Sequence, residues 1–318
     1  MRQTCVDMVY ELAKRDPRVL FIGSDLSPGL LAGMKAEFPD RYYMEGVTEA
    51  NLVGMSAGLA MEGFSPYANT IATFITRRCY EQVAIDLCLH NLPVRLIGNG
   101  GGVVYAPLGP THLAIEDIAI MRSLPNMAVV AVCDKDEMIR FMNQSLEWPG
   151  PIYIRLAKGG DPIVSRDELG FTIGKAITMR QSASRNRPVL MATGVATTQC
   201  LKAAEILAAA GIDVSVVHFH TVKPIDVDAI LHHAADTNLV VTVEEGVKIG
   251  GFGSAIADVL LEKLDRDHPS IVRLGLPDEF PHHYGSQAEQ FDYYGLSGEK
   301  IAESVKKALA RKNTAIPA

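Results

Sequence analysis

The sequence predicts an α/β protein of two domains, each built on a mainly parallel sheet flanked by helices. Short apolar runs alternate with longer amphipathic ones, which is the pattern of a parallel sheet covered by helices. The 318 residues are 48% apolar, enough for two cores of ordinary size. Composition turns polar, with Gly and Pro, over residues 161–187, so we expect a linker there between domains at 1–160 and 188–318.

The first domain is expected to alternate helices with strands. Amphipathic runs predict helices at residues 3–14, 49–62, 74–90, 114–123 and 135–146. Short apolar runs predict strands at Val19–Gly23, Tyr67–Asn69, Val94–Asn99, Ala128–Val132 and Ile152–Leu156. Asp134 stands directly before the helix at 135–146, where an aspartate is a favoured N-cap.

The second domain continues the same alternation. Helices are expected at residues 196–210, 226–235, 253–264 and 298–311. Strands are expected at Val189–Ala192, Val214–Phe219, Leu239–Val243 and Ile271–Leu274. The sequence shows no short internal repeat, so a repeat architecture is not predicted.

Charge and cysteine content exclude several classes of protein. A net charge of −7 without any Lys/Arg block makes nucleic acids and anionic membrane surfaces poor partners. The sequence has no apolar run near the ~20 residues of a membrane span and no apolar segment of a secretory signal. The five cysteines are widely spaced without a C-x-x-C pair, which argues against zinc, redox motifs and disulfides. We therefore expect a cytoplasmic protein.

The segment from Gly46 to Gly63 places one carboxylate, Glu49, at the head of an apolar helix of small residues. An acid in the first turn can simply complement the helix dipole, and Thr48 can cap the helix. Two features favour a functional role. No other charge occurs before Glu62, and the small residues suit close packing against another backbone, including one in another chain. A carboxyl buried there would have a raised pKa and could donate a proton or a strong hydrogen bond.

Phe74 lies among small polar residues where a strand passes into a helix. A single Phe is usually a core residue. The carboxyl end of a strand is also where open α/β sheets bind ligands, so this ring could equally be a stacking platform. Arg77 and Arg78 follow, and they are most simply interpreted as a solvated or interface face.

A long Gly- and Pro-rich loop begins at Gly100 and ends at His112. Loops of this length in compact domains are often functional. His112 could be a simple cap partner at a helix start, but its position also suggests a mechanistic role. The other eight histidines lie on expected helix faces, strands or the C-terminal tail, without the spacing of metal ligands.

Two further charged residues have more than one interpretation. Arg155 is a cation inside an apolar strand, so it needs an anionic partner, either structural or a substrate phosphate or carboxylate. Asp25 follows the strand at Val19–Gly23 and is ambiguous by itself.

The sequence lacks the usual motifs for binding a diphosphate. Neither Gly-Asp-Gly followed about thirty residues later by Asn nor Gly-x-x-x-x-Gly-Lys-[Ser/Thr] occurs in it. Glu49 looks like an acid for a bound heterocycle, yet this chain alone cannot hold that cofactor's phosphates. The sequence therefore indicates half of an active site.

Taken together, these segments resemble the C-terminal half of the thiamine-diphosphate-dependent transketolases, over essentially the whole chain. Residues 46–51 are similar to the segment whose glutamate touches the aminopyrimidine ring, and residues 69–74 to the segment whose aromatic ring stacks on it. Residues 109–112 resemble the loop whose histidine reaches the substrate, and residues 243–254 the Glu-Glu…Gly-Gly-x-Gly-Ser run of this superfamily. The resemblance implies a pyrimidine-binding fold followed by a transketolase C-terminal-like fold.

The resemblance also implies a cofactor and residue roles. The cofactor would be thiamine diphosphate with Mg²⁺, the metal held mainly by a partner subunit. Glu49 would hydrogen-bond the ring nitrogen N1′ and so favour removal of a proton from the reactive carbon of the cofactor. Phe74 would stack on the pyrimidine, and Asp25 would contact the cofactor. His112 would steady a substrate hydroxyl or shuttle its proton. The other residues assigned to the substrate are Arg2, Arg77 and Arg155.

The chain departs from the family pattern at three positions that face the substrate. Leu108 stands where an Asp usually contacts a substrate hydroxyl, Gly100 about where another His is usual, and Gly29 where a phosphate-contacting Ser is often found. These changes argue against the usual pentose-phosphate substrates. They leave the cofactor chemistry untouched.

The leading hypothesis is the β subunit of a split transketolase that transfers a two-carbon ketol unit between sugars or sugar phosphates. It would be active only with an α subunit that supplies the diphosphate and Mg²⁺ site, in an α₂β₂ tetramer. An enzymatic alternative is a 1-deoxyxylulose-5-phosphate synthase-like or decarboxylase β subunit that uses a 2-oxo acid, which the loss of Asp at Leu108 slightly favours. A non-catalytic regulatory partner is a third alternative, against which the retention of Glu49, Phe74 and His112 argues.

Overall fold

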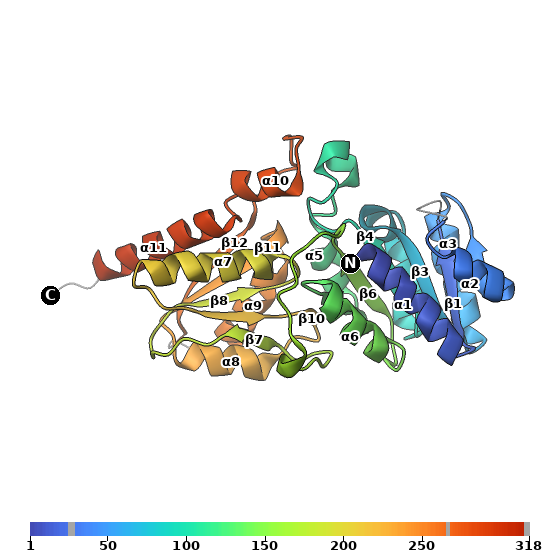
Figure 1. The fold of residues 1–318 in the computed structure, drawn as a ribbon, viewed down its shortest axis with the longest axis horizontal. Helices are drawn as coiled ribbons and strands as arrows, with labels where there is room; N and C mark the ends of the chain where they lie inside the picture. Colours follow the sequence, from blue (N-terminus) through green and yellow to red (C-terminus); the bar gives the residue numbers. More distant parts are fainter. Residues whose placement is uncertain (25–28, 265–267, 315–318) are drawn as a thin grey trace.

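The computed structural model describes residues 1–24, 29–264 and 268–314, and their side chains as far as Arg311. Two α/β domains lie side by side along the long axis of the molecule, the first blue to green and the second yellow to red (Figure 1). Each contains a mainly parallel sheet with helices on both faces, which confirms the predicted fold class. In the described part of the chain, no helix combines the length and apolarity needed to cross a membrane.

The first domain is built on a seven-stranded sheet. Six strands come from the first half of the chain: β1 (Val19–Gly23), β2 (Tyr42–Met44), β3 (Ser65–Ile71), β4 (Arg95–Asn99), β5 (Ala128–Ala131) and β6 (Ile152–Leu156). The seventh, β10 (Thr221–Lys223), comes from the second half. The order is β10-β5-β6-β4-β3-β1-β2, and all neighbours are parallel except β10 and β5. Because the strands are parallel, β1, β3, β4 and β6 end at one edge of the sheet.

Helices cover both faces of this sheet. On one face lie α1 (Arg2–Arg15) and α6 (Lys135–Ser145), and on the other lie α3 (Glu49–Met61), the helix at 74–89 and α5 (Asp117–Ser123). Asp134 caps α6 as predicted, because its carboxylate accepts hydrogen bonds from two backbone N–H groups at 3.0 and 2.9 Å. The predicted side-chain cap of α3 is wrong. The Thr48 hydroxyl donates backwards to the carbonyl of Glu45 at 2.9 Å.

The second domain contains a five-stranded sheet in the order β12-β11-β8-β9-β7. The strands are β7 (Ile177–Arg180), β8 (Val189–Ala192), β9 (Ser215–His218), β11 (Leu239–Val247) and β12 (Ser270–Leu276). All neighbours are parallel except β7 and β9. Helices α7 (Ala196–Ala209) and α11 (Gly298–Thr314) cover one face, and α8 (Val227–Ala235) and α9 (Phe252–Lys263) cover the other.

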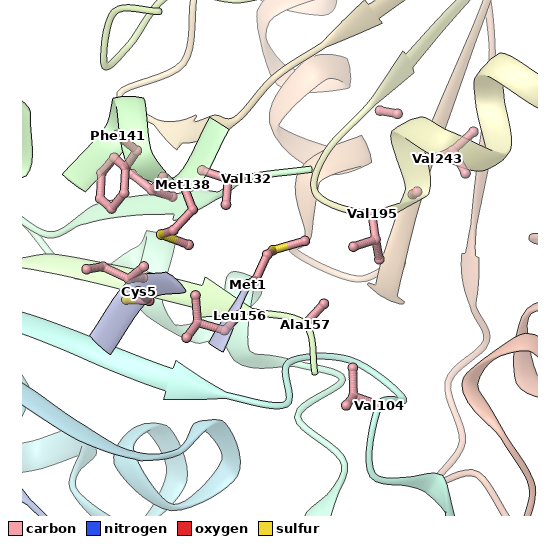
Figure 2. Close-up of a cluster of buried hydrophobic side chains, with 14 of the residues drawn as sticks. Met1, Cys5, Val104, Val132, Met138, Phe141, Leu156, Ala157, Val195 and Val243 are labelled. Atoms are coloured by element: carbon pink, nitrogen blue, oxygen red, sulfur yellow. The ribbon is translucent and has the colours of Figure 1, made fainter. Parts of the chain in front are cut away.

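The two domains share hydrogen bonds and a hydrophobic core. Strand β10 pairs with β5, and the backbone of Ala131 bonds both to His220 at 2.8 Å and to Gly194 at 3.0 Å. Figure 2 shows Met1 of the first domain in one buried cluster with Val195 of the second. We call this shared region the domain seam. Its hydrogen bonds and apolar contacts hold the second domain against the first.

The elements that the sequence did not predict are short. They are α2 (Ala32–Glu37), β2, β7, β10 and α10 (Gln287–Tyr293). Periodicity needs a longer window to be visible, and β7 and β10 are held by antiparallel partners distant in sequence. Strand β7 lies inside the expected linker at 161–187. The helix expected from 114 begins only at Asp117, because Ala114 is held in a β-bridge to Gly101 and Gly102.

Candidate active site

Glu49 is buried in the first turn of α3 and paired with an arginine. The residue is 3% exposed, and its Oε2 accepts a hydrogen bond from Nη1 of Arg78 at 2.8 Å. The Arg78 side chain is 49% exposed, so this ion pair reaches from the interior to the surface. The N-terminus of α3 places further positive partial charge beside the carboxylate. Glu49 is therefore a buried acid that a group arriving from outside could contact.

Phe74 joins Arg78 to His112. The ring begins a π-helical turn, Phe74–Arg78, close after β3, and π turns often occur at functional sites. Cζ of Arg78 lies over the ring, 4.3 Å from its centroid, and the His112 ring meets it edge-on at 5.3 Å between centroids. Glu49, Phe74 and His112 were singled out separately in the sequence. The structure brings them into one chain of contacts through Arg78.

The second nitrogen of His112 is available for a ligand. Nδ1 lies 2.9 Å from the Thr111 hydroxyl, while Nε2 has no hydrogen bond to the residues that the structure describes. The loop is closed at its base, because Gly102 and Ala114 exchange two backbone hydrogen bonds of 2.9 and 3.1 Å. His112 thus stands at the end of a fixed loop, with one nitrogen free to bind a hydroxyl.

Glycine is required at the start of this loop. Gly100 has a φ of +74°, and a Cβ there would run into the ring of Tyr105. At Gly101 and Gly102, a Cβ would strike the buried side chains of Arg155 and Glu245 respectively. The Gly-rich run therefore lets the backbone approach the domain seam, and Tyr105 fills the side-chain space above Gly100.

Arg77 anchors the segment that follows His112. Its guanidinium forms an ion pair with Glu116, with Nη2 and Oε2 2.7 Å apart, and donates to the carbonyl of Leu113 at 2.9 Å. The side chain is 29% exposed, so it is neither fully solvated nor free. These contacts tie the π-helical turn to the loop of His112.

Arg155 has structural partners at the domain seam, and its expected role at the substrate stays a prediction. The side chain is 5% exposed and lies at the domain seam. Nε donates to Oδ2 of Asp117 at 2.8 Å, and Nη2 donates to the backbone carbonyl of Glu245 at 2.5 Å. The Glu245 carboxylate is 3.7 Å from Nη1. Of the two alternatives that the sequence left open, the structure supports the structural anion.

Glu244 and Glu245 are buried in the second domain beside the loop of the first. Glu244 accepts hydrogen bonds from the N–H groups of Phe252 and Gly253, at the start of α9, at 2.7 and 2.8 Å. Glu245 accepts one from the N–H of Val103 at 3.0 Å. Burial raises the pKa of both carboxyls to about 7. The Glu-Glu run thus positions a helix and the His112 loop.

A polar cluster at the carboxyl ends of β3 and β4 was not predicted. Nδ2 of Asn99 donates to Oδ1 of Asn69 at 2.6 Å and to the carbonyl of Thr70 at 2.8 Å. Oδ1 of Asn99 and Oγ1 of Thr73 are buried without a hydrogen-bond partner among the described residues. Polar side chains at the ends of apolar strands were the available signal, because ligands bind at that edge of a parallel sheet.

A second unpredicted cluster joins the domains. Potential ligand atoms of Cys133, Glu137 and His218 lie within 4.8 Å of one another. Oε2 of Glu137, on α6, accepts from the N–H of Cys133 at 2.7 Å and lies 2.9 Å from Nε2 of His218, on β9. Glu137 and His218 are 81 positions apart, so spacing in the sequence could not reveal the pair. All five cysteines are buried free thiols.

For two residues of the predicted site, Asp25 and Arg2, the described part of the chain shows no contact with Glu49, Phe74 or His112. Asp25 falls outside the described residues. Arg2 is half-buried at the start of α1, and no hydrogen bond or ion pair among the described residues links it to Glu49, Phe74 or His112.

The sequence matches known proteins along both domains. Residues 1–160 match the transketolase pyrimidine-binding domain, and residues 178–301 match the transketolase C-terminal domain. The 6-deoxy-6-sulfo-D-fructose transketolase subunit of Clostridium sp. (strain MSTE9) is 33% identical, over 98% of this chain and 95% of that subunit. The 1-deoxy-D-xylulose-5-phosphate synthase of Desulforudis audaxviator (strain MP104C) is 35% identical over 95% of this chain. The alignment covers 48% of that enzyme, so this chain spans about half its length.

The fold has a close counterpart among solved structures. A split-gene transketolase, solved as an inactive β4 tetramer, superimposes with a TM-score of 0.88 at 33% identity, covering 97% of this chain and 98% of that one. Family and fold therefore agree over nearly the whole chain, as the resemblance implied. The chain belongs to the transketolase family of thiamine-diphosphate-dependent transferases, and it contains the pyrimidine-binding and C-terminal domains of that family.

Proposed function

We propose that this chain is the β subunit of a split transketolase that transfers a two-carbon ketol unit between sugars or sugar phosphates. One observation carries the proposal: the buried acid Glu49, at the start of α3, is linked through Arg78 to Phe74 and His112. An α subunit would hold the diphosphate and Mg²⁺ of thiamine diphosphate, in an α₂β₂ complex. The five buried thiols suit the reducing cytoplasm, where we place the enzyme.

The residues of this half-site fit an aminopyrimidine. Glu49 offers a buried carboxyl for a ring nitrogen, and Phe74 offers a ring face for stacking. A planar group, the guanidinium of Arg78, already makes both contacts in this structure. Bound thiamine diphosphate would supply the carbon nucleophile that attacks a ketose carbonyl. Glu49 would hold and return a proton at the ring nitrogen N1′, and Nε2 of His112 would hold a substrate hydroxyl.

The surface beside Glu49 supports a partner subunit. A Cβ added at Gly54 or Gly58 on α3 would meet no atom within 4 Å, so the helix leaves room for close approach. Met61 at the end of α3 and Ile85 and Leu89 on the helix beside it are 56%, 51% and 68% exposed. Exposed apolar groups gathered on adjacent helices are typical of protein interfaces. We expect the α subunit to cover this face and complete the cofactor site.

The residues expected to face the substrate, at positions 100 and 108, favour a donor other than the usual pentose phosphates. Leu108 is 54% exposed and offers no hydrogen bond, and Tyr105 occupies the space above Gly100. A relative of similar length is named for a sulfonated ketose, which has an altered anionic end. We therefore expect a modified ketose as donor. The loss of the Asp at position 108 keeps a 2-oxo acid as the second candidate.

Reconstitution with the α subunit tests the proposal. The complex with thiamine diphosphate and Mg²⁺ should convert ketose donors in the presence of an aldehyde acceptor, and the chain alone should not. A complex that consumes pyruvate but no ketose would replace the proposal with the synthase alternative. Tight cofactor binding by this chain without a partner would refute the split enzyme.

The role of Glu49 has its own test. Glu49→Gln in the reconstituted complex should slow hydrogen–deuterium exchange at C2 of the cofactor by about 10²–10⁴, the usual size of a general acid–base effect. Glu62→Gln, at the exposed end of the same helix, is the matched control and should exchange normally. Near-normal exchange in Glu49→Gln, with only a lower melting temperature, would make Glu49 a structural residue.

A further inference from the structure

A single side chain makes both contacts that the proposed function assigns to the cofactor ring. Nη1 of Arg78 donates to Oε2 of Glu49 at 2.8 Å, and Cζ lies over the ring of Phe74 at 4.3 Å from its centroid. A guanidinium is planar, donates hydrogen bonds in its plane and stacks on aromatic faces. An aminopyrimidine is also planar and would use the same carboxylate and the same ring face. The two groups therefore compete for one position.

Burial explains why Glu49 needs a partner. The carboxylate is inside the protein, and a buried charge without a partner is strongly unfavourable. Among the described residues, Arg78 is its only side-chain hydrogen-bond or ion-pair partner. In a chain without cofactor, this arginine therefore gives the buried acid a partner of opposite charge.

Arg78 is also able to leave. Its side chain is 49% exposed, and among the described residues Glu49 is its only hydrogen-bond or ion-pair partner. A guanidinium that moves into solvent is rehydrated, so it needs no second site in the protein. Arg77, by comparison, is held by both Glu116 and Leu113. Of these two neighbours, Arg78 is the one free to move.

We propose that Arg78 is a placeholder, a side chain that occupies the pyrimidine position until the cofactor binds and then moves away from Glu49. The inference rests on the proposed function, because it takes Glu49 and Phe74 as the ring site. The inference adds a role for Arg78 that the ketol transfer itself does not need. The placeholder protects the half-site before assembly and lowers the apparent affinity for the cofactor.

The size of the effect follows from the competition. When only the open form of the protein can bind, the apparent Kd rises by a factor of one plus the closed-to-open ratio. For a half-exposed ion pair this ratio is up to about fivefold. Removal of Arg78 should therefore tighten cofactor binding by about three- to fivefold, whereas loss of an arginine that holds the cofactor would weaken it.

The test is the Kd of thiamine diphosphate, at saturating Mg²⁺, for the reconstituted complex carrying Arg78→Ala. Arg18→Ala is the matched control, since Arg18 is 51% exposed and pairs with a carboxylate, that of Asp16. We expect a Kd lowered about three- to fivefold in Arg78→Ala and unchanged in Arg18→Ala. Arg78→Gln, which keeps a hydrogen-bond donor without charge, should fall between the two and serves if the alanine variant does not fold.

The possible results distinguish a failure of the placeholder role of Arg78 from a failure of the proposed transketolase function. A Kd that is unchanged or higher in folded, assembled Arg78 variants would overturn the placeholder while leaving the split transketolase intact. A wild-type complex that binds no thiamine diphosphate would instead overturn the proposed function. A structure of the loaded complex in which Arg78 still contacts Glu49 would also refute the inference.

Discussion

Replacing Arg155 with methionine tests whether this residue belongs to the domain seam or to the substrate. Methionine keeps much of the length of the side chain but removes the charge. In this structure the change leaves Asp117 and Glu245 buried without their cation. Breaking a buried ion pair by removing one partner costs about 3–5 kcal/mol. We therefore expect Arg155→Met to lower the free energy of unfolding by about 4 kcal/mol at pH 8.

Chemical denaturation of the isolated chain measures this loss. Arg180→Met is the control, because Arg180 pairs with Asp213 on the surface, where such a pair is worth about 1 kcal/mol or less. Part of the loss in Arg155→Met should be recovered at pH 5. There Glu245, whose pKa burial raises to about 7, can take up a proton and no longer carries an unpaired charge.

A different result would show that Arg155 faces the substrate. If Arg155→Met unfolds like the wild type and the reconstituted enzyme shows a KM for the donor raised at least about tenfold, the residue binds a substrate anion. The buried contacts described above would then not be those of the working enzyme. Wild-type stability with wild-type kinetics would refute both roles.

Three further predictions concern the seam and the loop. Because burial raises the pKa of Glu245 to about 7, the folded chain keeps a proton that the unfolded chain has lost, so stability falls as pH rises from about 4.5 to about 7. Denaturation at several pH values should show this slope reduced in Glu245→Gln by up to about 1.4 kcal/mol per pH unit, and parallel curves would contradict it. Gly100→Ala should cost about 1–3 kcal/mol, since φ is +74° and the methyl meets Tyr105; a melt matching the wild type would disprove the close contact. Glu137→Gln should destabilise the chain by about 1–3 kcal/mol by weakening the buried bond to His218, and urea unfolding at pH 7 checks it.

Strands and long helices could be predicted because their signals are local. An apolar run such as Val19–Gly23 or Ile152–Leu156 is buried along its whole length, so its composition alone indicates a central strand. The cap at Asp134 is equally local. Strand β10 is different. Its residues pair with β5 residues that lie more than ninety positions earlier in the chain, and nothing within the segment specifies that partner.

In the candidate site, too, local features could be predicted from the sequence and contacts distant in sequence could not. Glu49, Phe74 and His112 could be proposed from the sequence because each stands at the end of a strand or the start of a helix, and their roles stay predictions. The contact of Arg78 with Glu49 depends on a π-helical turn, which residue patterns do not reveal. The partners of Arg155 lie 38 and 90 positions away, so the sequence could state the need for an anion but not its source.

The second domain supplies none of the residues predicted to do chemistry, yet it holds the loop that carries His112. Glu245 binds the N–H of Val103 where the loop begins, and the N–H of Val247 donates to the carbonyl of Ile115 where it ends, at 2.8 Å. Loop position sets the distance from Nε2 of His112 to any bound hydroxyl. A catalytic group misplaced by about 1 Å can lose about 10²-fold in rate. If His112 binds a substrate hydroxyl as proposed, the C-terminal domain would act on the reaction through geometry, and substitutions at Glu245 should alter turnover although Glu245 would contact no reacting atom.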